Sequence, residues 1–115
     1  MSVPRFINAA TLPATTPPPL TGPWAPTDTR IDEAVLVPLP AGHAPEDVAV
    51  SPDGAVFTGT AEGVIWRRRS GEFERLADTG GRPLGIEHDP RDDSLIVCDA
   101  YRGLLRLTPT AHCTT

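Results

Sequence analysis

The chain has 115 residues, 14 of them proline, and a formal net charge of −5 at pH 7. Nine of the prolines precede residue 41, and what remains is so short that burying a core is marginal without help. The acidic balance argues against a nucleic-acid partner, because phosphate binding needs a basic surface. The one basic run, residues 67–69, is interpreted as a solvated strand edge.

Residues 1–33 are expected to form an extended, largely disordered leader. The three consecutive prolines at 17–19 favour polyproline II, and Thr, Ala and Pro dominate the segment. Trp24 stands between prolines, and both a docked anchor and an exposed ring remain open for it. No signal peptide and no membrane span are predicted, because the N-terminus lacks a long apolar run. Residues 34–39 are predicted to form a strand that closes at the turn beginning at Pro40.

From residue 46 onward, short apolar runs alternate with turn residues. Gly, Pro and Asp stand wherever the backbone must reverse. No segment keeps a helical apolar period, so a meander is favoured over a βαβ alternation. The fold class predicted is all-β and antiparallel, with residues 110–115 as an irregular tail. The predicted strands are 47–50, 56–60, 64–68, 73–77, 84–88, 95–99 and 104–108.

Two stretches of the chain repeat each other at the spacing of a β-propeller blade. Val48 matches Ile86 at an offset of 38, and Gly63 matches Gly103 at an offset of 40. A period of about 40 residues with several short strands is typical of propeller blades. The chain is expected to hold four strands of a first blade and three of a second, within residues 34–109. Because closure needs about four to eight blades, missing blades or further copies are expected as partners.

The two cysteines do not form a disulfide framework. Cys98 follows the apolar run at 95–97 and is expected to be a small buried residue, whereas Cys113 lies in the tail. A bridge between them is not expected. Reduced thiols and a cytoplasmic location are therefore predicted.

Particular motifs resemble a known family. Residues 42–50, followed by residues 59–67, look like the first blade of strictosidine synthase-like proteins. Gly-Arg-Pro-Leu-Gly at 81–85 and Asp-Ala-Tyr-Arg-Gly-Leu at 99–104 look like their second blade. These proteins belong with the senescence marker protein–gluconolactonase group and are related to paraoxonases. The resemblance covers about residues 40–109, and it implies the N-terminal fragment of a six-bladed propeller, often with a divalent metal, usually calcium, in its channel.

Glu46 and Asp47 are the candidate metal-binding residues. The resemblance places them where paraoxonase-like relatives have a Glu-Asp pair on calcium, and hard cations do prefer carboxylate oxygens. The alternative is a strand-opening pair that satisfies backbone amides near a turn. Calcium takes about six to eight oxygens, so any site in this chain by itself is expected to be weak or absent.

The other polar candidates are weaker. The three histidines show no metal-binding spacing, and His88 is expected at a solvent-facing strand end, with a channel-facing position as the alternative. Asp99 is expected to cap backbone amides and Tyr101 to pack between blades. Arg82 is a candidate for a guanidinium near the channel mouth. No nucleophile elbow is present, so catalytic residues stay unidentified and are expected in missing blades.

With the resemblance, the function predicted is that of a fragment whose parent is a metal-dependent hydrolase of small-molecule esters or lactones. One alternative is a non-enzymatic binding module, including two-blade pieces that assemble as three copies. A second is amine–aldehyde condensation of the strictosidine synthase type in the parent. The 115-residue chain alone is predicted to be inactive.

Overall fold

A computed structural model describes residues 14–27, 30–108 and 113–114. The chain divides into two units, Met1–Leu36 and Val37–Thr115. The first unit contains two short 3₁₀ turns, η2 (Gly22–Trp24) and η3 (Arg30–Glu33). Trp24 lies in η2 with its side chain exposed, and docking of this residue stays a prediction. The expectation of disorder for residues 1–13 lies outside the described residues.

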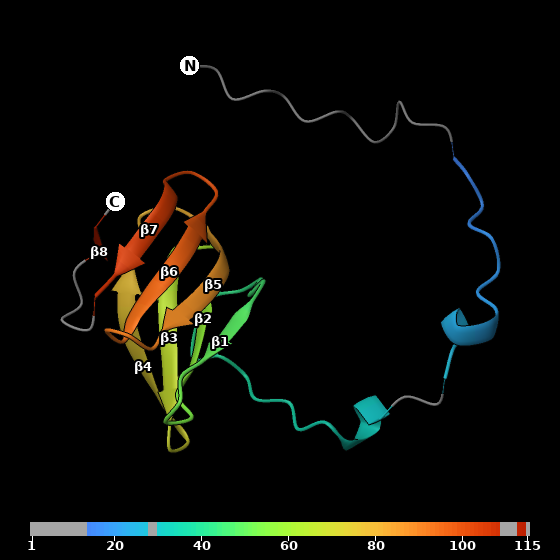
Figure 1. The fold of residues 1–115 in the computed structure, drawn as a ribbon, viewed down its shortest axis with the longest axis horizontal. Coiled ribbons are helices and arrows are strands. Elements are labelled where there is room, and N and C mark those ends of the chain that lie inside the picture. Colours follow the sequence, from blue (N-terminus) through green and yellow to red (C-terminus); the bar gives the residue numbers. More distant parts are fainter. Residues whose placement is uncertain (1–13, 28–29, 109–112, 115) are drawn as a thin grey trace. The chain divides into compact units, whose positions relative to one another are not determined.

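The second unit consists of two four-stranded antiparallel sheets, which confirms the all-β meander (Figure 1). Each strand pairs with the next one along the chain. The sheets do not close on each other, as expected for two blades of a propeller. Sheet A contains β1 (Val48–Val50), β2 (Val56–Gly59), β3 (Val64–Arg69) and β4 (Glu72–Asp78). Sheet B contains β5 (Pro83–Asp89), β6 (Ser94–Asp99), β7 (Gly103–Leu107) and β8 (Cys113–Thr114).

Two strand predictions were wrong. Residues 34–39 form no strand, although the run is apolar; Val35 and Leu36 are exposed, and strands need a paired neighbour to be stable. Conversely, β8 adds a fourth strand to sheet B, because Cys113 and Thr114 of the predicted irregular tail pair with Leu107 and Arg106. The other residues of that tail lie outside the described part of the chain.

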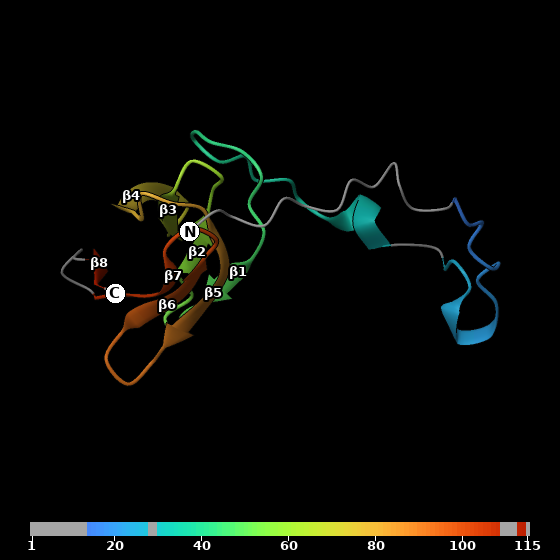
Figure 2. The same cartoon turned by 90° about the horizontal axis from the view of Figure 1, so that it is seen from above.

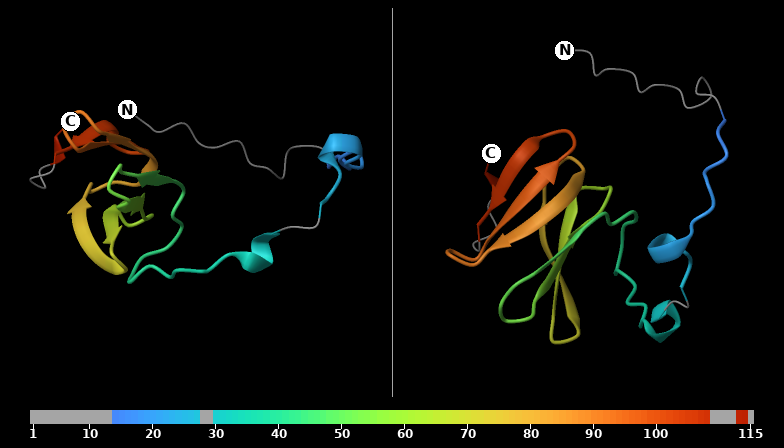
Figure 3. Two further views of the ribbon diagram at one scale, coloured as in Figure 1. Left: turned by 60° about the horizontal axis from the view of Figure 1, so that its bottom comes forward. Right: turned by 45° about the vertical axis from the view of Figure 1, so that its right-hand side comes forward.

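The core lies between the two sheets, with β5 beside β1 and β2 (Figures 2 and 3). Period-two alternation sends one apolar face of each sheet into it. Its buried members are Ala49, Ala55, Phe57, Ile65, Ile86, Leu95, Val97, Leu105 and Leu107. The core is therefore shared by the blades, so neither sheet can bury it alone.

His88 joins this core and does not face solvent. Its side chain is 3 % exposed, and its ring stacks on Phe57 of sheet A at 5.9 Å between centroids. Its Nε2 lies 2.6 Å from an Asp93 carboxylate oxygen, which satisfies the buried ring nitrogen. The prediction of a solvent-facing strand end was wrong because the second blade buries this face against the first.

Two further burial predictions were also wrong. Cys98 is exposed, since it alternates with the buried Val97 and points to the other face of sheet B. Tyr101 is 74 % exposed at the β6–β7 turn and does not pack between the sheets. Both residues are therefore outside the shared core.

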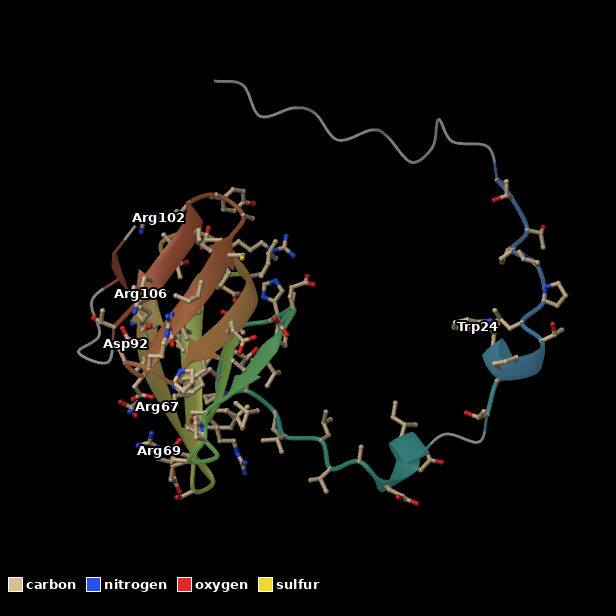
Figure 4. The ribbon with its side chains drawn as sticks, in the orientation of Figure 1. Trp24, Arg67, Arg69, Asp92, Arg102 and Arg106 are labelled. Atoms are coloured by element: carbon tan, nitrogen blue, oxygen red, sulfur yellow. The ribbon has the colours of Figure 1, made fainter. Side chains whose placement is uncertain are left out.

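The basic run on β3 is only partly a solvated edge. Arg67 pairs with Glu74 on β4 at 2.6 Å, and Arg69 pairs with Asp53 at 2.8 Å. Figure 4 labels the two arginines. Arg68 points to the opposite face, where its guanidinium lies 5.8 Å from the Phe73 ring centroid. No helix in the described ranges is long and apolar enough to span a membrane.

Candidate functional site

The candidate site lies where the segment before β1 meets the β4–β5 connector and the β6–β7 turn. Glu46 and Asp47 come from the first segment, residues 79–82 from the connector, and residues 99–102 from the turn. Hydrogen bonds between these three segments hold the two blades in register at this end of the sheets. The site therefore belongs to the blade boundary and to neither sheet alone.

Asp47 uses both carboxylate oxygens on backbone amides. Its Oδ2 accepts the Ile86 amide at 3.1 Å, and its Oδ1 accepts the Val48 amide at 2.8 Å. These two bonds, that from Ile86 first, hold the pKa of Asp47 below its ordinary value against the opposing effect of desolvation. Its backbone carbonyl accepts the Thr58 hydroxyl at 2.7 Å. The side chain thus satisfies amides near a strand start, as the second interpretation proposed, and a metal-binding role stays a prediction.

Glu46 is the carboxylate that remains available at this end. Its Oε1 lies 3.4 Å from Nη2 of Arg82, and about half of its side chain is exposed. Arg82 comes from the connector between the blades, so this ion pair also crosses the boundary. The Arg82 Nε is buried and has no partner among the described residues. The guanidinium is therefore held beside Glu46 with part of its hydrogen-bonding capacity unused.

The described residues do not form a calcium site by themselves. Among them, no group of three or more His, Cys, Asp or Glu side chains is placed to hold a metal. Both carboxylate oxygens of Asp47 accept backbone amides, and Glu46 is already paired with the guanidinium of Arg82. One carboxylate falls far short of the roughly six to eight oxygens that calcium takes.

Asp99 is the most heavily bonded side chain of the site. It is buried, with 5 % exposure, and its Oδ1 accepts three backbone amides, from Arg82, Tyr101 and Arg102, at 2.9–3.0 Å. Its Oδ2 accepts the Thr79 hydroxyl at 2.7 Å. Burial alone would raise the pKa of Asp99, but these hydrogen bonds outweigh it and hold the pKa below its ordinary value. The prediction that Asp99 caps amides is confirmed.

The β6–β7 turn and the connector also bind each other directly. Arg102 Nη1 donates to the Thr79 carbonyl at 2.6 Å, and the Ala100 amide donates to the Arg82 carbonyl at 2.8 Å. At Gly81 a Cβ would lie 2.7 Å from Asp99 Cγ, so the connector can pass only without a side chain there. The two motifs of the second blade, at 81–85 and 99–104, are therefore one hydrogen-bonded unit. The resemblance uses the two motifs together as one signature, but it assigns no role to Thr79.

His43 has a partner that the sequence did not indicate. Its Nδ1 contacts the Glu62 carboxylate, and its amide donates to Glu62 Oε2 at 3.2 Å. The Ala61 amide in turn donates to the His43 carbonyl at 3.0 Å. This pair fastens the segment before β1 to the β2–β3 turn. Both side chains are solvent-accessible.

Residues 22–68 match the family described as "Strictosidine synthase-like, N-terminal". The chain is 40 % identical over 73 residues to the protein strictosidine synthase-like 6 of Arabidopsis thaliana, covering 57 % of this chain and 19 % of that protein. It is 38 % identical over 78 residues to the human adipocyte plasma membrane-associated protein, covering 56 % and 18 %. To the same-named protein of Gallus gallus it is 35 % identical over 111 residues, covering 81 % and 25 %.

These comparisons confirm the resemblance carried by the first-blade motifs. The family match begins at residue 22, within the proline-rich segment that was expected to be a leader, and ends in β3. The chain spans about a fifth to a quarter of the length of these curated relatives.

Proposed function

We propose that the chain, whose residues 22–68 match the N-terminal part of the strictosidine synthase-like family, forms the first two blades of a propeller protein that hydrolyses small-molecule esters or lactones. Further blades would complete both the ring and the site. The uncovered outer faces support the first part: Val48 and Val50 of sheet A and Leu104 of sheet B are 57–67 % exposed. Apolar faces of this kind normally pack against a neighbour.

The observation that carries the hydrolase proposal is the placement of Glu46. Among the described residues at the blade boundary, it is the carboxylate that backbone amides do not occupy, while Asp47 and Asp99 fix the chain on either side of it. In this proposal Glu46 supplies one oxygen to the divalent cation of the complete protein. Asp47 acts as a positioning residue, and the other oxygens come from residues beyond those described. The cation itself, with calcium as the first candidate, belongs to the proposal.

A specific observation favours the non-enzymatic alternative. Arg82 already neutralises Glu46, so a cation would have to displace its guanidinium. A propeller that only presents loops to partners needs no cation at Glu46, so its Glu46–Arg82 ion pair would stay intact. Amine–aldehyde condensation rests on the family match alone, and a cytoplasmic location remains a prediction.

The test uses the complete coding frame that contains these residues. We expect its purified product to hydrolyse 4-nitrophenyl acetate or dihydrocoumarin, to lose activity with EDTA and to regain it with calcium. Glu46→Gln should lower kcat/KM by at least about tenfold, whereas the matched Glu72→Gln on β4 should not. The 115-residue chain should show no turnover above buffer. A folded full product that hydrolyses neither substrate would favour the binding module.

A further inference from the structure

The pairing registers make the two sheets equivalent, residue by residue. Thr58 pairs with Val48 and Trp66 in sheet A as Val97 pairs with Ile86 and Leu105 in sheet B. We call the face that carries these residues the front face and the opposite one the back face. The front face of sheet B is Ile86, His88, Leu95, Val97, Leu105 and Leu107. The front face of sheet A is, in the same order, Val48, Val50, Val56, Thr58, Trp66 and Arg68.

In the chain, the front face of sheet B packs on the back face of sheet A. His88 stacks on Phe57, and Pro83 lies against Gly59, where a Cβ would come within 2.7 Å of the proline Cβ. The contact therefore depends on a proline before the inner strand and on a missing side chain opposite it. Pro45, three residues before Val48, is the counterpart of Pro83, three residues before Ile86.

The front face of sheet A is not covered in this way. It forms a hollow of roughly 330 Å³. The residues around this hollow include Val37, Leu39 and Pro45 from the segment before β1, and Trp66, Arg68 and Phe73 from the sheet. The polar atoms in it are unusual for an interface between blades. Trp66 Nε1 and Arg68 Nε are buried and have no acceptor among the described residues. At the equivalent positions sheet B has Leu105 and Leu107, whose side chains need no hydrogen-bond acceptor.

Unpaired buried donors destabilise a protein, and a guanidinium is best satisfied by a carboxylate. We propose that the front face of sheet A receives the back face of a further blade that carries a carboxylate opposite Trp66 and Arg68 and a glycine opposite Pro45. This inference rests on the proposed propeller, but not on the hydrolase activity. The blade repeat alone predicts that a neighbouring blade exists, whereas these contacts also predict which side chains that blade carries.

A second copy of this chain does not meet these requirements. On the back face of sheet B, Cys98 stands where sheet A has Gly59, and Leu104 stands where sheet A has Ile65. Cys98 would overlap Pro45 of the other copy. Leu104 offers no acceptor to Trp66 and Arg68, and the neighbouring Arg106 adds a cation that is paired with Asp92 (Figure 4). Assembly of unaltered two-blade copies is therefore disfavoured by the same contacts that define the partner.

The back face of sheet B can serve as the probe once both mismatches are removed. Cys98→Gly clears the place opposite Pro45, and Leu104→Glu puts a carboxylate at the Ile65 position; both residues are exposed in the wild type. We expect the double variant to associate head to tail in sedimentation velocity, with a dissociation constant at least about tenfold lower than that of wild type. The amide spectrum should show the Trp66 indole NH shifting on association.

The matched control is Cys98→Gly with Leu104→Lys, which opens the same space with the wrong charge and should remain monomeric. Adding Arg68→Glu to that control reverses the pair and should restore association. Dispersed amide spectra show that each variant is folded. Equal association of the Glu and Lys variants, or a folded Glu variant that stays monomeric while the reversed pair also fails, overturns the proposal. Association of the wild type through Trp66 also overturns it, in favour of a second copy.

These results are distinguishable from failure of the proposed function. A folded two-sheet chain that fails only the association test removes the partner chemistry and leaves the propeller intact. An inactive full product leaves the association result unaffected.

Discussion

Asp47 reaches across the blade boundary and accepts the backbone amide of Ile86 at 3.1 Å, 39 residues further along the chain. The contact falls where the register of β5 and β6 shifts, between Pro83 and Ile86. A bulge of this kind takes backbone groups out of the strand ladder. The Asp47 side chain, just before β1 of the first blade, therefore accepts an amide at the irregular part of β5 in the second blade. This hydrogen bond fixes how the second blade lies against the first.

Replacing Asp47 by Asn should lower the melting temperature of the chain, because an amide presents only one acceptor to the amides of Val48 and Ile86. The pKa of Asp47 is held below its ordinary value in the folded state by these amides. Its contribution to stability is thus present above the ordinary pKa of the unfolded chain and is lost as the pH falls through the depressed folded pKa. Thermal unfolding followed by circular dichroism should show a shallower acid dependence in the variant. The neighbouring Glu46→Gln is the control and should melt like wild type.

Asp99→Ala should be more damaging, at about 3 kcal/mol of unfolding free energy, because it leaves one buried and three partly buried donors without their charged acceptor. A chain of this size has little stability to spare. The variant should therefore be largely unfolded in a urea titration read by tryptophan fluorescence. Glu72→Ala, which removes an exposed carboxylate on β4, should keep the wild-type midpoint. A native midpoint for Asp99→Ala would show that the four hydrogen bonds contribute little.

Thr79→Val tests the same cluster by proton linkage. The substitution keeps the shape of the side chain but removes the 2.7 Å hydrogen bond to Asp99 Oδ2. The folded pKa of Asp99 should then rise toward its ordinary value, and its stabilising effect should be lost at a higher pH. We expect the midpoint of acid unfolding to move upward, with a loss of about 2 kcal/mol at neutral pH. A midpoint that moves down or stays in place contradicts this account of the Asp99 pKa.

The all-β meander and its blade repeat could be predicted because they are local. Gly and Pro mark the turns, and period-two alternation marks the strands, as in β6 and its buried Leu95 and Val97. The strand predicted at 34–39 and the missed β8 have one cause. Whether an apolar or irregular segment forms a strand depends on a partner edge, and no local pattern reports that partner.

The candidate site was predictable only in part. The Glu46-Asp47 dipeptide was found, but its two members have separate roles, with Asp47 on amides and Glu46 beside Arg82. That division depends on Arg82 in the connector and Ile86 in β5, which lie more than thirty residues away along the chain. Burial of His88 and exposure of Cys98 were misjudged for a related reason. Alternation shows that they lie on opposite faces, but not which face the neighbouring sheet covers.

The close packing of the two blades at Gly59 gives the last prediction. A Cβ at Gly59 would lie 2.7 Å from Pro83 Cβ, whereas a Cβ at Gly85 would meet nothing nearer than 3.8 Å. Neither glycine has a positive φ, so backbone strain is the same for both. Gly59→Ala should therefore cost about 1–3 kcal/mol by pushing the sheets apart, and Gly85→Ala should be close to neutral. Chemical denaturation of the two variants side by side measures the difference, and equal midpoints would show that the blade boundary yields to a methyl group.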